Sequence, residues 1–127
     1  MKDRNAKRVT SRKTGKRGVE AIFRAFADQT RLRIMVLLRN REVCVGDIVE
    51  VLNVSQPTAS RHLASLRRSG LVVSRKEGQW IYYSLARANS QLLKGLFGCL
   101  KDCQEEMPAM RLDATRFQRL KQKGGCC

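Results

Sequence analysis

Five cysteines are the residues of this sequence best suited to chemistry, because a thiolate is both a nucleophile and a ligand for soft metal ions. Cys99 and Cys103 are four residues apart, and on a helix this spacing places two side chains about 5–6 Å apart on one face. Two thiols at that distance can share one thiophilic ion. Cys126 and Cys127 follow Gly124 in a tail that could supply a third sulfur. We therefore take Cys99, Cys103, Cys126 and Cys127 as the candidate metal site.

Other interpretations of the cysteines stay open. A cysteine on an amphipathic helix is often a small buried apolar residue, and Cys44 alone fits that description. Oxidation of Cys44, or of Cys99 and Cys103 to a disulfide, would instead make the protein a redox or persulfide sensor. Zinc is disfavoured, because its sites usually have four ligands and a second paired motif, which this sequence does not contain.

The chain is short and strongly basic. It has 127 residues, with 26 Lys and Arg against 11 Asp and Glu, which gives a formal net charge of +15. This length allows one domain with a single core and excludes a large two-domain enzyme. Residues 1–18 carry most of their charge as Lys and Arg and are predicted to be a disordered basic arm. The arm lacks the apolar segment of a secretory signal, and the apolar run at 34–38 is too short to cross a membrane, so we expect a cytoplasmic protein with no membrane partner.

The elements that must position these residues follow from the spacing of apolar side chains. Two short helices are expected after the arm, the second capped by Asp28, and a third over residues 46–52 that ends in a turn at Asn53. Ser55 is expected to cap a fourth helix that runs to about Ser69 and leaves a basic outer face.

The second half of the chain predicts a hairpin and further helices. Two β-rich runs, 71–73 and 80–85, are separated by a polar, Gly-containing connection, and we expect their aromatic residues to be mostly core. A fifth helix is expected from a cap at Asn89 to about Pro108. We expect residues 19–107 to form one domain and residues 108–127 to form a C-terminal amphipathic tail with the terminal Cys pair.

The order of these elements predicts a winged helix-turn-helix, a mainly α fold with a small β-hairpin. In that fold the second helix of the motif enters the major groove of DNA, and cations on the hairpin neutralise phosphates. A basic solvated surface is the plainer alternative, but here the cations gather on the helix and the hairpin that would face DNA. The candidate DNA-binding residues are Ser55, Gln56, Thr58, Ser60, Arg61, His62, Arg75 and Lys76.

Three of these residues have a more specific expected role. Arg61 and Gln56 suit two-pronged contacts to guanine and adenine, respectively. His62 is the only histidine and has no second ligand at metal spacing, so we expect it to contact DNA or to make a local hydrogen bond. An enzyme is not expected, because no nucleophile is paired with a base elsewhere in the chain.

Residues 23–85, about half of the chain, resemble the ArsR/SmtB family of metal-responsive repressors. The resemblance is carried by four segments: FADQTRLRI at 26–34, EVCVGDI at 42–48, SQPTASRHL at 55–63 and RKEGQWIYYSL at 75–85. It implies a homodimer joined through its first and last helices and bound to palindromic, double-stranded operator DNA until a metal or metalloid lowers its affinity. Arsenical repressors of this family usually carry Cys-Val-Cys in the second segment, whereas this chain has Cys44-Val45-Gly46 and lacks that second thiol.

Together, these observations predict a repressor that leaves its operator when trivalent arsenic, As(III), binds cysteine thiolates. Sb(III), Cd and Pb are further candidate inducers, since each binds thiolates. No permanent cofactor is expected. The alternative is a thiol redox or persulfide sensor of the same fold.

Overall fold

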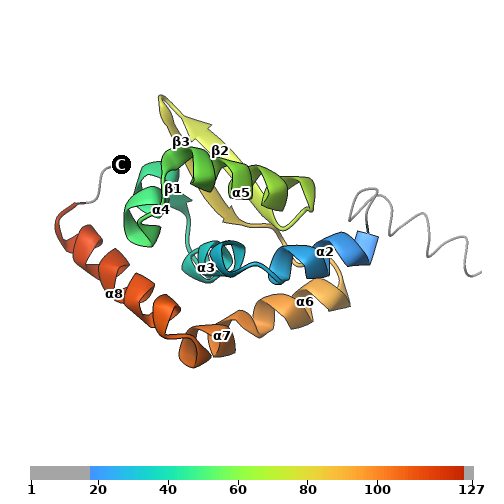
Figure 1. The fold of residues 1–127 in the computed structure, drawn as a ribbon. Helices are drawn as coiled ribbons and strands as arrows, with labels where there is room; N and C mark the ends of the chain where they lie inside the picture. Colours follow the sequence, from blue (N-terminus) through green and yellow to red (C-terminus); the bar gives the residue numbers. More distant parts are fainter. Residues whose placement is uncertain (1–17, 125–127) are drawn as a thin grey trace, which may run out of the picture.

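The computed structural model describes residues 18–124, and its elements follow one another in the order expected for a winged helix-turn-helix (Figure 1). The elements are α2 (Gly18–Phe26), α3 (Gln29–Leu37), β1 (Val43–Cys44), α4 (Val45–Leu52), α5 (Gln56–Arg68), β2 (Val72–Glu77), β3 (Trp80–Leu85), α6 (Gln91–Gly98), α7 (Leu100–Glu106) and α8 (Pro108–Gln122). The mainly helical fold with a small antiparallel sheet is confirmed. The expected basic arm lies outside the described residues, apart from Gly18.

Local caps and one left-handed turn set the boundaries of the first helices. The carboxylate of Asp28 accepts a hydrogen bond from the backbone N–H of Arg31 at 2.9 Å and caps α3. Asn53 ends α4 with φ +57°, a conformation that Asn tolerates better than most residues. Ser55 then caps α5 by accepting from the backbone N–H of Thr58 at 3.3 Å. These predicted caps and the turn are confirmed, and they fix α4 and α5 as the two helices of the motif.

The wing is a three-stranded antiparallel sheet in the order β1-β3-β2. The sequence predicted the hairpin of β2 and β3 but not β1, which pairs Val43 with Tyr83 and continues directly into α4. The hairpin connection is also shorter than expected, because β2 extends to Glu77 and the chain turns at Gly78, whose φ is +62°. The expectation of core aromatics is wrong for Trp80, which lies at the hairpin end with 37% of its surface exposed.

The core joins the helix-turn-helix to the rest of the chain. The inner stripe of α5 is Ala59, Leu63 and Leu66, and none of these side chains is exposed. Leu63 and Leu66 belong to a buried apolar cluster that extends from α2 to Met110 on α8. Among the helices of residues 18–124, none is both long and apolar enough to cross a membrane.

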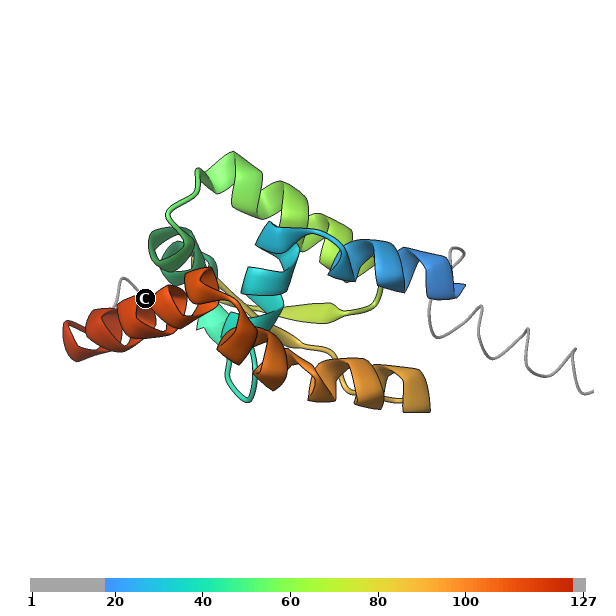
Figure 2. The ribbon, with the colours of Figure 1, turned by 60° about the horizontal axis from the view of Figure 1, so that its bottom comes forward.

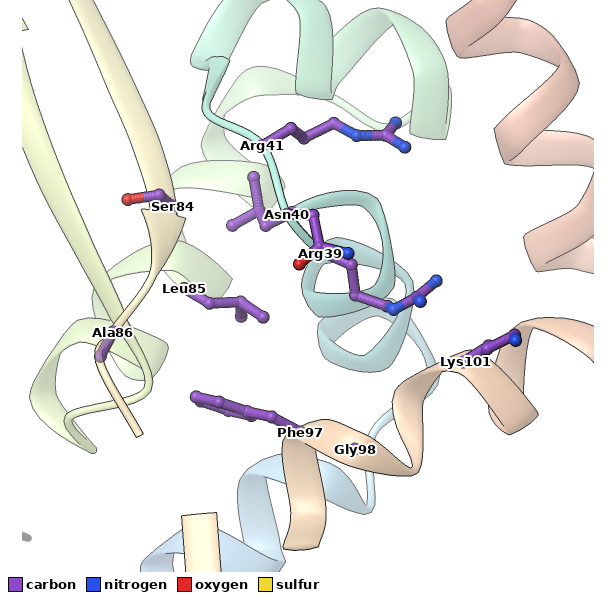
Figure 3. A pocket seen from close by; sticks show the side chains of 10 residues that line it. Arg39, Asn40, Arg41, Ser84, Leu85, Ala86, Phe97, Gly98 and Lys101 are labelled. Carbon is purple, nitrogen blue, oxygen red and sulfur yellow. The ribbon is translucent and has the colours of Figure 1, made fainter. Parts of the chain in front are cut away.

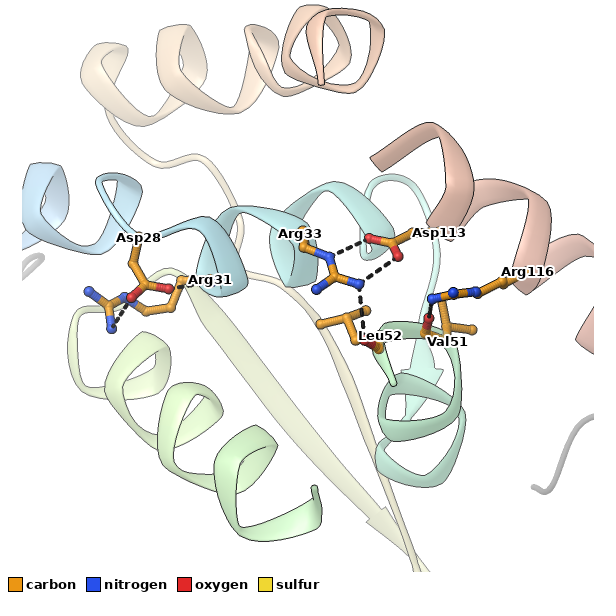
Figure 4. Close-up of polar contacts among 7 residues, drawn as sticks. All are labelled: Asp28, Arg31, Arg33, Val51, Leu52, Asp113 and Arg116. Atoms are coloured by element: carbon orange, nitrogen blue, oxygen red, sulfur yellow. Dashed lines mark hydrogen bonds and ion pairs between the residues drawn. The ribbon is translucent and has the colours of Figure 1, made fainter. Parts of the chain in front are cut away.

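Helix α8, from the segment expected as an amphipathic tail, packs along α3 and α4 (Figure 2). Asp113, 4% exposed, receives two hydrogen bonds of 2.8 Å from the guanidinium of Arg33 on α3. The same guanidinium donates to the carbonyl of Leu52, and Arg116 donates to the carbonyl of Val51, so α8 holds the C-terminal end of α4 (Figure 4). The boundary expected near residue 107 falls between α7 and α8.

The single helix expected over residues 89–107 is wrong in two respects, its cap and its continuity. Ser90, rather than Asn89, caps α6 by accepting from the backbone N–H of Leu93. The helix then breaks at Cys99, which lies between α6 and α7 with φ −83° and ψ −5°. Gly98 directly precedes the break, and its low helix propensity favours an interruption at this position.

Candidate DNA interface and thiol pair

The outer face of α5 is polar and basic, and the helix sequence contains no acidic residue. Four predicted contact residues, Ser55, Gln56, Ser60 and Arg61, are exposed on or next to it. Arg67 and Arg68 add two exposed cations in the last turn. Because the apolar stripe of α5 is fully buried, the phase of the helix is fixed and these side chains point away from the core. The surface has the shape and charge that a major groove accepts.

Two of the candidate residues, Ser55 and Thr58, also stabilise the first turn of α5. The hydroxyl of Ser55 donates to the Thr58 hydroxyl at 2.9 Å while also accepting from the Thr58 backbone. Both side chains are therefore engaged in holding the N-terminus of the helix. The backbone N–H groups of that turn carry the positive end of the helix dipole, which favours a nearby phosphate.

His62 lies between α5 and α3, half-buried. Its Nδ1 is 3.3 Å from Nη1 of Arg31, and Arg31 also donates to the backbone carbonyls of Arg24 and Ala25. The partner of His62 is therefore not a local one but Arg31, 31 positions away in the sequence, and this hydrogen bond requires an unprotonated Nδ1. Burial, and then the charges of Arg31 and Arg61, lower the pKa of His62, and the carboxylate of Asp28 only partly opposes them.

The two predicted cations of the wing, Arg75 and Lys76, differ in their contacts. Arg75 donates to both carboxylate oxygens of Glu42, at 2.9 and 2.7 Å, and to Glu77 at 2.6 Å. Its guanidinium also lies 4.7 Å from the ring centre of Tyr82. These hydrogen bonds raise the pKa of Arg75 and balance its charge. Lys76 is exposed, and the structure gives it no carboxylate within 4.0 Å among residues 18–124.

Cys99 and Cys103 lie one helical turn apart at the junction of α6 and α7. The backbone N–H of Cys103 donates to the carbonyl of Cys99 at 3.1 Å, so the expected i, i+4 relationship persists through the break. The Cys99 thiol donates to the carbonyl of Leu96 at 3.0 Å. Burial raises the pKa of the Cys103 thiol, and the neighbouring Cys99 and Asp102 add to the rise. Both cysteines are free thiols and half-buried.

The structure brings together only part of the predicted metal site. Cys126 and Cys127 lie outside the described residues, so their placement relative to the pair is not part of the structure. Within residues 18–124, no group of three His, Cys, Asp or Glu side chains could hold a metal ion. Cys44 lies elsewhere, at the end of β1, with 1% of its surface exposed.

A cavity of about 600 Å³ borders the junction that carries the thiol pair. It is lined by the turn after α3, by the end of β3 and by the end of α6, with Phe97 and Leu85 on its apolar side (Figure 3). Arg39 and Lys101 contribute cations to its lining. Gly98, next to Cys99, also borders it, so this side of the junction has room to move.

Two features of the site were missed from the sequence. Glu42 is the principal partner of Arg75, and it lies 33 residues away on the segment before β1. Arg31 supports His62 from α3. The available signal was weak in both cases, because an exposed Glu or a helical Arg has no spacing that identifies a distant partner.

The chain is similar in sequence and fold to known proteins. Residues 28–74 match the family model described as "Bacterial regulatory protein, arsR family". The chain is 36% identical over 100 residues to the arsenic resistance transcriptional regulator ArsR1 of Pseudomonas putida, covering 78% of this chain and 77% of that protein. It is 50% identical over 66 residues to the arsenical resistance operon repressor of Escherichia coli, covering 51% of this chain and 56% of that protein. Among solved structures, it is similar to the homodimeric winged helix-turn-helix DNA-binding domain Mb0332 of Mycobacterium bovis, a possible ArsR-family regulator (32% identity, 69% of this chain, 79% of that chain, TM-score 0.58).

Proposed function

The chain belongs to the ArsR family of bacterial regulatory proteins, and on that premise we propose that it is a homodimeric repressor that leaves its operator when As(III) binds cysteine thiols. The observation that carries the proposal is the outer face of α5, polar and basic along its whole length beside the wing. Arg61 and Gln56 are the proposed base readers, and Ser55, Thr58, Ser60, His62, Arg75 and Lys76 complete the proposed contact set. Such a repressor would act on chromosomal DNA in the cytoplasm.

Exposed apolar residues on α2 support a dimer. Val19 and Phe23 lie one turn apart on this helix, and 46% and 49% of their surfaces are exposed. Burying a side chain the size of Phe contributes about 1.5–3 kcal/mol, so the pair favours an interface. A two-fold dimer would present two copies of α5 to a palindromic operator, as the family architecture requires.

The thiol pair at the α6–α7 junction supports sensing by As(III). At neutral pH arsenic(III) is mainly neutral arsenous acid, As(OH)₃. Each thiol that replaces a hydroxide forms one As–S bond, and its proton leaves with the hydroxide as one water, so no free proton is released into solution. A divalent ion such as Cd²⁺ or Pb²⁺ must instead displace the thiol protons. The raised pKa of Cys103 therefore disfavours divalent ions more than it disfavours As(III).

We propose Cys99 and Cys103 as two ligands and Cys126 or Cys127 as the third. A ligand shifts an equilibrium only by its differential affinity for two states, so As(III) must fit the dimer that binds DNA weakly better than the dimer that binds it tightly. The break at Cys99 is where a change in helix direction costs least, and the adjoining cavity leaves space for it. A changed junction would alter the separation of the two α5 helices.

One titration tests the proposal. Reduced protein bound to DNA from its own promoter region is titrated with arsenite, antimonite, Cd²⁺ and Pb²⁺, and release of DNA is measured by fluorescence anisotropy. Arsenite should release wild-type protein but not the Cys99→Ser or Cys103→Ser variants, which should still bind the operator. The comparison of Cys126→Ser with Cys127→Ser identifies the third ligand. A response that survives in both junction variants and disappears in Cys44→Ser would place the sensor at the start of α4 and overturn the assignment.

Redox sensing is the second candidate, favoured by the position of the two free thiols one helical turn apart. Hydrogen peroxide would oxidise the pair to a disulfide, with reduction of the peroxide to two molecules of water. A raised thiol pKa slows this reaction, because the thiolate is the reactive form. Mass spectrometry separates the candidates: an arsenic adduct under reducing conditions supports the first, and loss of two hydrogens with peroxide-dependent DNA release supports the second.

A further inference from the structure

Helix α8 and the turn of the helix-turn-helix together form a basic groove. The groove has a volume of about 320 Å³ and lies between Asn53, at the end of α4, and three cations of α8. Arg116, Arg119 and Lys123 occupy positions i, i+3 and i+7, which is one face of a helix. Figures 1 and 2 show α8 alongside α4. The cations at the end of α8 thus lie beside Asn53, which is two residues before the cap of α5.

The three cations differ in their contacts with the rest of the protein. Arg116 donates to the carbonyl of Val51 at 3.2 Å, so it satisfies the C-terminal end of α4. Arg119 and Lys123 are exposed, and no carboxylate of residues 18–124 lies within 4.0 Å of either. Glu50 is the one acid in the groove lining. The groove therefore has an excess of positive charge that contacts within the described chain do not neutralise.

The position of the groove identifies its occupant. In a helix-turn-helix the first helix crosses the DNA backbone while the second enters the groove. Here the first helix is α4, and the basic groove adjoins its end and the turn into α5. With α5 in the major groove, the phosphates that flank that groove would pass along this side of the motif.

We propose that Arg119 and Lys123 bind backbone phosphates of the operator, so that α8 is a third DNA-contacting element beside α5 and the wing. This inference rests on the proposed function, because it requires α5 to be in the major groove. It assigns a DNA-binding role to a helix outside the matched residues 28–74. Phosphate contacts position the protein on the duplex and do not select the sequence. A cation near the end of α8 also stabilises its helix dipole, so the test must separate DNA binding from stability.

The test compares two double variants that each remove two positive charges. Arg119→Gln with Lys123→Gln changes the groove. Arg87→Gln with Lys94→Gln changes two exposed residues, one in the segment before α6 and one on α6, and Figure 1 shows α6 on the side away from α5. Affinity for operator DNA is measured between 50 and 200 mM salt, and thermal unfolding is measured alongside. A third variant, Arg119→Lys with Lys123→Arg, preserves both charges.

The groove variant should flatten the log–log salt dependence by roughly 1.8 per protomer, since each phosphate contact contributes about 0.9. The Arg87→Gln with Lys94→Gln control and the charge-preserving variant should keep the wild-type slope. The preference for operator over random DNA should be unchanged in all three variants. Equal slopes for the groove variant and the Arg87→Gln with Lys94→Gln control, with wild-type protein still binding its operator, overturn this inference but not the proposed function. Failure of wild-type protein to bind DNA overturns the proposed function as well. Lowered thermal stability of the groove variant without a change in slope assigns the cations to the helix dipole.

Discussion

Arg33 and Asp113 are 80 residues apart in the sequence, yet they form a two-pronged ion pair with both N–O distances at 2.8 Å. The side chains are 16% and 5% exposed, and the pair joins α3, in the middle of the helix-turn-helix domain, to α8. The hydrogen bond with Asp113 raises the pKa of Arg33, which keeps its charge in this partly buried position. The pair therefore makes α8 part of the domain.

Asp113→Ala should lower the free energy of unfolding by roughly 3 kcal/mol, because it leaves a partly buried guanidinium with the Leu52 carbonyl as its remaining acceptor. Asp113→Asn should cost less, since the amide oxygen still accepts one hydrogen bond. Urea unfolding monitored by circular dichroism gives both values. A loss below about 0.5 kcal/mol for the alanine variant would be typical of an exposed ion pair and would contradict the structural role.

The stability of the protein should fall as the pH falls through the ordinary pKa of histidine, near 6.5. The folded-state pKa of His62 is lowered, so the unfolded chain takes up a proton first and the stability present above 6.5 is lost on acidification. His62→Gln, which still offers an acceptor to Arg31, should remove this slope between about pH 7 and 5.5. Urea titrations at several pH values measure it. An identical slope in the variant would assign the effect to other groups.

Binding of arsenite and of cadmium should differ in pH dependence. Cd²⁺ displaces a proton from Cys103, whose pKa is raised, so its apparent affinity should increase about tenfold per pH unit for each proton released. Arsenite binding should change little between pH 6 and 8, because its hydroxides take up the thiol protons as water. Isothermal titration calorimetry in buffers of different ionisation enthalpy counts the protons released. Equal proton release for both ligands would refute the chemical argument for As(III).

Substitutions in α5 and in the wing should change DNA binding in different ways. Arg61→Ala removes a proposed base contact and should relax sequence preference by about 1–3 kcal/mol at one position. Lys76→Ala removes a proposed phosphate contact and should weaken binding to all duplexes equally while flattening the salt dependence by about 0.9 per protomer. Competition binding with operator and scrambled duplexes distinguishes the two. Matching behaviour of the variants would mean that Arg61 does not contact a base edge.

Glu42→Gln should strengthen DNA binding without altering sequence preference. In the free protein Glu42 takes two hydrogen bonds from Arg75, and a phosphate must compete for that guanidinium. Removing the negative charge releases Arg75 for a phosphate and should steepen the salt dependence by up to about 0.9 per protomer. Arg75→Gln in the same background serves as the control and should cancel the gain. Weaker DNA binding by Glu42→Gln would show that the Arg75 clamp itself holds the wing in its binding position.

Local signals predicted the helix-turn-helix well. Asp28, Asn53 and Ser55 act through hydrogen bonds or backbone preferences within four residues, so their roles can be derived from the sequence. β1 has two residues and no periodicity, so no sequence pattern indicates it. The break at Cys99 had a signal in Gly98, but the apolar stripe across it favoured a continuous helix.

In the candidate site, too, local relationships could be predicted and contacts between distant residues could not. The exposed face of α5 follows from its buried stripe and was predicted. The clamp between Glu42 and Arg75 and the hydrogen bond between Arg31 and His62 join residues more than 30 positions apart, and charge patterning does not specify such partners. The i, i+4 relationship of Cys99 and Cys103 was predictable because it is local.

The short strand β1 constrains how an inducer can act. It ends at the residue before α4 begins and pairs with Tyr82 and Tyr83 of β3, so the wing and the first helix of the motif are joined by backbone hydrogen bonds. In the proposed repressor, β1, α4 and the wing would therefore move together as one rigid unit, and the junction of α6 and α7 would be the place where its direction changes. An inducer bound at that junction would not have to unfold any proposed DNA-contacting residue. A small change in angle there would be enough to move two intact recognition units out of register with the turns of the double helix.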